Sequence, residues 1–130
     1  MNDLWGNTIV DGFSNNTAKK MIKALQYRKQ RDIYYKRTIK EIQITENDLI
    51  LKFQQQNGKC YWTNLTLNEK YNSISKHPFA ISVERLNNDI GYTFDNTVLT
   101  RRIFNLGRSD FPEKDFFDII QSLKEDFKNN

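Results

Sequence analysis

Apolar residues recur at helical spacing near the start of the chain, just after Asn15, Asn16 and Thr17, which are residue types that cap helices. The spacing is i, i+3, i+4 and i+7, over Ala18, Met21, Ile22 and Leu25. Such a stripe predicts a helix with one buried face and a lysine-rich face in solvent. The helical pattern fades between residues 32 and 38.

Two further helices are predicted. Thr45, with Asp48 three residues on, forms a capping-box pattern before Leu49, Ile50 and Phe53, and Gly58 is a suitable stop. Pro112 opens a last helix over residues 112–128. Its apolar residues are expected to supply much of the core: Phe116, Phe117, Ile119, Ile120, Leu123 and Phe127.

Short alternating segments lie between these helices. Residues 42–44 predict an extended piece, residues 79–83 a strand, residues 97–99 its hairpin partner, and residues 101–108 a short helix. This order indicates a small α+β fold. We expect a lead over residues 1–16, with Trp5, Ile9, Val10 and Phe13 available to dock. The domain over 17–130 would comprise a basic helical arm (17–40), a core at about 58–108 and the C-terminal helix.

Composition fits one domain with a modest core: 130 residues, of which 38% are hydrophobic. Cys60 is the only cysteine, which excludes an intramolecular disulfide and a cysteine zinc cluster. No apolar run approaches the roughly 18 residues of a membrane span, and no signal-peptide pattern opens the chain. We expect an intracellular protein. Richness in Asn, Ile and Lys is typical of AT-rich genomes, such as those of a phage, a large DNA virus or a low-GC bacterium, so a host cytoplasm or a virion is the expected place.

Positive charge gathers in the first predicted helix, although the net charge of the chain is only +4. Asp32 is the one acid among nine basic residues: Lys19, Lys20, Lys23, Arg28, Lys29, Arg31, Lys36, Arg37 and Lys40. A basic arm on a near-balanced body is typical of polyanion binders; a solvated helix face is the alternative. We expect all but Lys40 to contact nucleic acid, together with Arg101, Arg102 and Arg108. Tyr34 and Tyr35 either stack on bases or pack inside, and core packing is favoured for at least one.

Residues 82–105 carry the densest set of chemically useful side chains. A strand, a polar loop, a second strand and a short helix could bring carboxylate, guanidinium and carboxamide groups to one point. The residues in question are Glu84, Arg85, Tyr92, Asp95, Asn96 and Asn105. Such a constellation suits a phosphodiester, with an oxygen-ligated divalent cation beside a fixed positive charge.

The segments NGKCYWTNLTL (57–67) and ISVERLNNDIGYTFDNTVLTRRIFNLGR (81–108) resemble the HNH, or His-Me finger, endonucleases of phage and restriction type. Members of that family show a GKC hairpin, then S-x-D-R, then GY-x-x-DN-x-x-L, then N-x-x-K on a helix. The matching segments here are residues 58–60, 82–85, 91–99 and 105–108. The resemblance covers about half of the chain and implies a ββα-metal fold and a metal-dependent DNA endonuclease.

The resemblance also implies roles for single residues. Glu84 and Asn105 would ligate one Mg²⁺ or Mn²⁺ ion. Asn96 would brace the loop between the strands, and Arg85 would clamp the scissile phosphate. A homodimer is implied too, since small nucleases of this kind often need two copies to cut both strands.

Two departures from the family pattern matter. Arg85 stands where the family has its general-base histidine, and an arginine cannot act as a base. His77, the only histidine, becomes a candidate base, and the further candidates are Tyr61, Tyr92 and a metal-bound water. The zinc-binding Cys-x-x-Cys pairs of relatives are also missing, so no structural zinc is expected.

Two other functions therefore stand beside the endonuclease. One is a nuclease-derived module that binds nucleic acid without cutting it, which Arg85 motivates. The other is a virion or assembly protein that uses the fold as a scaffold. Salt-sensitive binding to DNA separates the first from the second.

Overall fold

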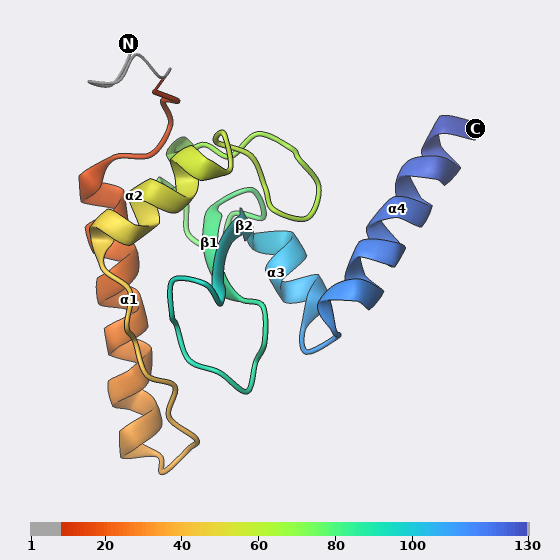
Figure 1. Cartoon of the computed structure of the whole chain (residues 1–130). Helices are drawn as coiled ribbons and strands as arrows, with labels where there is room; N and C mark the ends of the chain where they lie inside the picture. Colours follow the sequence, from red (N-terminus) through yellow and green to blue (C-terminus); the bar gives the residue numbers. More distant parts are fainter. Residues whose placement is uncertain (1–8, 130) are drawn as a thin grey trace.

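The computed structural model describes residues 9–129, which form four α-helices and one two-stranded sheet (Figure 1). In chain order the elements are α1 (Asn15–Tyr34), α2 (Glu46–Gln55), the short 3-10 helix η1 (Glu69–Ser73), β1 (Ile81–Arg85), β2 (Thr97–Arg101), α3 (Arg102–Arg108) and α4 (Glu113–Asn129). The predicted α+β class is confirmed. Trp5 lies outside the described residues, whereas Val10 and Phe13 dock on the core as expected.

Side-chain caps set the starts of the first two helices. The Ser14 hydroxyl accepts a hydrogen bond from the Thr17 amide at 3.3 Å, so α1 begins slightly earlier than predicted. At α2 the predicted capping box is confirmed. The Thr45 hydroxyl accepts from the Asp48 amide at 3.2 Å, and the Asp48 carboxylate accepts from the Thr45 amide at 2.9 Å. The two helices pack together on one side of the hairpin (Figure 1).

The hairpin pairs β1 and β2 antiparallel, with Glu84 opposite Val98 and Arg85 opposite Thr97. β1 begins two residues later than predicted because a turn occupies the preceding segment. There the Phe79 amide donates to His77 Nδ1 at 3.0 Å, and the Ala80 amide donates to the His77 carbonyl at 3.1 Å. Since α3 begins at the residue after β2 ends, hairpin and helix form one ββα unit.

The segment between α1 and α2 pairs with the long loop of the hairpin. The Tyr92 amide donates to the Glu41 carbonyl and the Gln43 amide to the Tyr92 carbonyl, both at 2.8 Å. This contact requires glycine at position 91, where an added Cβ would lie 2.5 Å from the Glu41 carbonyl oxygen. The predicted extended piece at residues 42–44 thus carries α1 and α2 against the loop.

The core lies between the α1–α2 pair, the hairpin and the Trp62 turn. The first half of α4 joins it: Phe116 and Ile120 are buried, and the partly exposed Phe117 ring packs on Trp62. The Trp62 ring packs against Phe116 at 5.0 Å between centroids. The expectation that α4 supplies much of the core is wrong, because its other apolar side chains are exposed, Phe127 to 80%. Figure 1 shows α4 projecting away from the body. Within residues 9–129, no helix has the length and apolar character that crossing a membrane requires.

We expect Gly91→Ala to lower the thermal midpoint by about 5–10 °C, because the methyl group must push the backbone at Glu41 away. Gly107→Ala is the matched control. Nothing lies within 4 Å of a Cβ at that position in α3, and alanine favours a helix, so the midpoint should hold or rise. Thermal unfolding followed by circular dichroism checks both; equal effects of the two substitutions would contradict the close approach.

Candidate active site and nucleic-acid interface

A polar pocket of about 370 Å³ opens where β1 and its following loop meet α3 and α1. It is lined by Arg28, Val83, Glu84, Arg85, Asn88, Tyr92, Asn105, Leu106, Ser109 and Asp110. Four of the side chains that the sequence singles out thus reach one place: Glu84, Arg85, Tyr92 and Asn105. They differ in what they present to the pocket.

Glu84 turns inward from β1, and only 1% of its side chain is exposed. The Trp62 indole donates to both carboxylate oxygens, at 3.0 and 3.1 Å. The Thr100 hydroxyl donates to Oε1 at 3.2 Å, and Arg108 Nε donates to Oε2. These four contacts occupy the four or so lone-pair sites of a carboxylate.

Arg108 completes a buried ion pair with Glu84. Besides the carboxylate, its guanidinium donates to the carbonyls of Arg85, Leu86 and Phe111 and to Asn88 Oδ1. Burial raises the pKa of the Glu84 carboxyl, while hydrogen bonds from Trp62 and Arg108 offset part of that effect. The expectation that Arg108 contacts nucleic acid is wrong, because the residue is 2% exposed and bound on every nitrogen.

The implied pair of metal ligands, Glu84 and Asn105, does not fit a divalent ion in this arrangement. Magnesium takes ionised oxygen ligands with room for water, and the Glu84 carboxylate has neither free lone pairs nor solvent. Asn105 Nδ2 donates to Ser82 Oγ at 2.7 Å, which leaves its Oδ1 oxygen available on the pocket side. Within residues 9–129 no three His, Cys, Asp or Glu side chains gather in a metal-binding group.

Arg85, the next residue of β1, is held with its guanidinium at the pocket. Its Nη1 donates to the Asn88 carbonyl at 2.7 Å and to the Ile90 carbonyl at 3.2 Å. The guanidinium also lies 5.2 Å from the centroid of the Tyr92 ring. Since two of its five N–H groups anchor it, three remain to bind an anion.

Asn96 holds the loop that shapes this pocket. Its Nδ2 donates to the carbonyls of Asn87 and Gly91, both at 3.0 Å, and its Oδ1 accepts from the Asn87 amide at 2.8 Å. The side chain is buried. These contacts brace the loop between the strands.

The candidate bases lie in different places. His77 does not line the pocket; its ring stacks on Tyr71 at 4.6 Å. Tyr61 donates its hydroxyl to Glu113, and burial together with that carboxylate raises the Tyr61 pKa above its usual range, so the phenol keeps its proton. Of these three side chains only Tyr92 lines the pocket.

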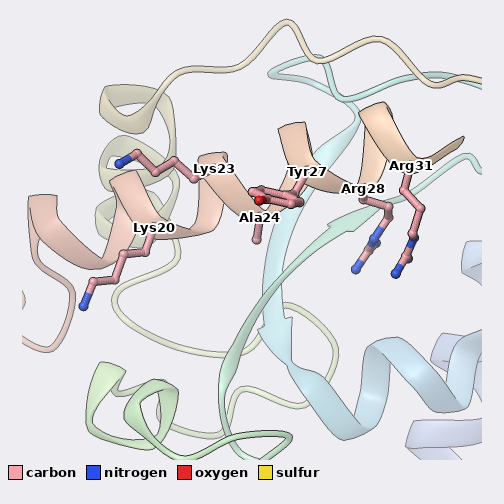
Figure 2. Close-up of a pocket in the computed structure, with 6 residues that line it drawn as sticks. All are labelled: Lys20, Lys23, Ala24, Tyr27, Arg28 and Arg31. Carbon is pink, nitrogen blue, oxygen red and sulfur yellow. The ribbon is translucent and has the colours of Figure 1, made fainter. Parts of the chain in front are cut away.

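A basic face on α1 adjoins the pocket. Its lining residues, shown in Figure 2, are Lys20, Lys23, Ala24, Tyr27, Arg28 and Arg31. Arg28 lines this face, the polar pocket and a narrow groove between α1 and β1, so the three surfaces are continuous. From the sequence Arg28 was expected in the basic arm, and its place in the pocket was not predicted. Its spacing of three from the buried Leu25 could have indicated that it lies at the edge of the apolar stripe, next to the body of the protein.

The other predicted nucleic-acid contacts are dispersed. Lys29 pairs with Glu41 at 2.9 Å and Arg37 with Asp32 at 3.6 Å, while Lys19 and Lys36 are exposed. Arg101 donates to the Thr66 carbonyl and Arg102 to the Lys76 carbonyl, away from the pocket. The favoured core position for Tyr34 or Tyr35 is wrong, since these side chains at the end of α1 are 79% and 59% exposed.

The hairpin joined directly to α3 gives the ββα arrangement of an HNH-like fold, and comparison with solved structures agrees with this fold. The chain is similar in fold to the rare-cutting HNH restriction endonuclease PacI, with a TM-score of 0.61 over 86% of this chain and 80% of that one. The two sequences are 15% identical, so the likeness shows the fold. No protein-family model and no curated protein sequence matches the chain.

We expect Glu84→Gln to lower the free energy of unfolding by about 3–5 kcal/mol, because it leaves the Arg108 charge buried without a counter-ion. Asp118→Asn is the matched control: it removes the exposed ion pair with Lys114 on α4 and should leave the urea midpoint unchanged. Urea unfolding measures both. A Glu84→Gln protein as stable as wild type would show that the carboxylate is no structural anchor and would reopen its role as a metal ligand.

Proposed function

We propose that this protein is an HNH-like endonuclease that binds DNA and hydrolyses its phosphodiester bonds. The fold it shares with a restriction endonuclease supports this proposal. The observation that carries it is Arg85, anchored by two carbonyls in a polar pocket that runs on into the basic face of α1. The fixed guanidinium of Arg85 can bind the phosphate that reacts, and the cations of the adjoining basic face can bind neighbouring phosphates and so position the DNA.

In this proposal each side chain of the pocket has a separate role in binding or hydrolysis. Arg85 binds the scissile phosphate and stabilises the charge that develops on its oxygens, and Arg28 binds the adjacent phosphate. Asn105 offers its amide oxygen to the attacking water. Tyr92 and Asp110 also line the pocket, whereas the Glu84 carboxylate is enclosed by its own hydrogen bonds. Because the expected ligands do not fit a metal here, no step is assigned to one.

A binding module that no longer cuts is the second candidate. Two observations favour it: Arg85 in place of a general base, and Glu84 held by three donors. Such a module would keep salt-sensitive binding through α1 and lack hydrolysis. A scaffold or virion protein would show neither property.

Plasmid nicking at low salt, with Mg²⁺ and then Mn²⁺, tests the endonuclease. We expect wild-type protein to nick, and Arg85→Gln to reduce the rate about 10²–10³-fold by removing charge stabilisation from the transition state. Asn105→Ala should also lose activity. Lys114→Gln removes one positive charge from an exposed position of α4 that does not line the pocket, and should nick at the wild-type rate.

The outcomes separate the candidates. Nicking that requires Arg85 supports the endonuclease, whether or not it also requires a divalent ion. DNA binding without nicking under either metal would overturn it in favour of the binding module, and absence of both activities would favour the scaffold.

We also propose that two copies associate through α4. Its exposed apolar side chains Ile119, Leu123 and Phe127 recur at i, i+4 and i+8, which forms a stripe suited to helix pairing. Light scattering should find a dimer for wild type and a monomer for Leu123→Asp. Gln121→Asp, an equal charge change at another exposed position of α4, should remain dimeric. A monomeric wild type at about 100 µM would contradict this proposal.

A further inference from the structure

We infer that the basic face of α1 receives an unpaired DNA strand beside the pocket, with the Tyr27 ring stacked on one of its bases. The inference rests on the proposed function for the chemistry of the pocket and extends it to the form of the substrate.

Tyr27 has no packing role in the fold that would explain it. Its side chain is 77% exposed in the middle of α1, where Lys or Ala would favour the helix more. Figure 2 shows its ring folded back along the helix toward Ala24, whose small side chain leaves room for it. The ring therefore lies on the basic face with one side open to a ligand.

The charges around Tyr27 define that ligand as a polyanion. Lys23 and Arg31 stand four residues before and after it, about 6 Å along the helix on either side. Neither is among the cations that pair with an acid within residues 9–129. A planar aromatic group between two free cations matches a base flanked by its phosphates.

The exposed ring favours an unpaired strand over a duplex. In a duplex the faces of the bases are stacked on one another, so a protein that contacts only the backbone has no use for an aromatic face. In a single strand every base offers a face, and stacking adds to the attraction of the phosphates. Tyr34, 79% exposed and seven residues after Tyr27, continues the same stripe and offers a second ring.

The strand would have a direct route to the pocket. Arg28 follows Tyr27 in sequence and lines both the basic face and the polar pocket. In Figure 2 Arg28 and Arg31 point in the same direction from α1. A nucleotide on Tyr27 thus places its neighbouring phosphate within the reach of Arg28 and, beyond it, of Arg85.

Binding in EDTA tests the inference without any cleavage. Fluorescence anisotropy would compare a labelled single strand, the same strand with one abasic position, and the duplex of that sequence. We expect Tyr27→Leu to weaken single-strand binding about 5-fold to 100-fold and to leave duplex binding nearly unchanged. Tyr27→Phe should bind as wild type, because the ring and not the hydroxyl makes the contact. Arg31→Gln, the charge control, should weaken both forms.

The abasic strand distinguishes stacking from a general effect on α1. Wild type should lose affinity when the base is removed, and Tyr27→Leu should not. Equal loss for Tyr27→Phe and Tyr27→Leu would overturn the inference, as would a Tyr27→Leu effect that is absent or the same for single strand and duplex. Base-dependent binding without nicking would refute the endonuclease alone, whereas nicking without base-dependent binding would refute this inference alone.

Discussion

The ββα unit depends on one buried ion pair, Glu84 with Arg108. Removing two charges from water costs several kcal/mol each, so they persist inside only when fully paired. Here both groups have all their partners: Trp62 and Thr100 donate hydrogen bonds to the Glu84 carboxylate, and backbone carbonyls accept the remaining hydrogen bonds of the Arg108 guanidinium. Because the partners come from β1, β2, α3 and the turn before them, one network fixes four parts of the chain. Removing any one of these partners would leave a buried charged or polar group without its hydrogen bond, which lowers the stability of the fold.

The same network decides what the pocket presents. Neighbouring residues of a strand point to opposite faces, so burying Glu84 directs Arg85 outward. Arg108 also helps to hold the loop, because its guanidinium donates to the carbonyls of Arg85 and Leu86, and Asn96 holds the loop farther on. The Glu84 carboxylate is thereby buried and engaged in the network, and the Arg85 guanidinium faces the pocket.

The sequence was a good guide wherever the signal was local. The Thr45 and Asp48 capping box, the stripe of α1 and the hairpin before α3 all rest on contacts within a few residues, and the structure has them. It failed where partners are distant. The motif around Glu84 does not indicate which face of β1 is buried. The only signal is that Asn105 and Arg108 are three residues apart, so they lie on the same face of α3 and can both reach β1. An apolar stripe likewise reveals that α4 has a face to cover without revealing the partner. Phe116, Phe117 and Ile120 pack against the body, whereas the apolar residues farther along α4 are exposed.

Free cations, more than total charge, define the surface for nucleic acid. Counting charges treated the basic residues of the arm other than Lys40 alike, but Lys29 and Arg37 are already paired with acids. Farther along, Arg101 is bound to a backbone carbonyl and Arg108 is enclosed. Each of these would lose a contact on binding a phosphate. The cations of the α1 face make no ion pair with an acid within residues 9–129, so binding a phosphate would displace only water and salt ions from them. Since that face is also continuous with the pocket through Arg28, the proposed binding surface and the proposed reaction site adjoin each other.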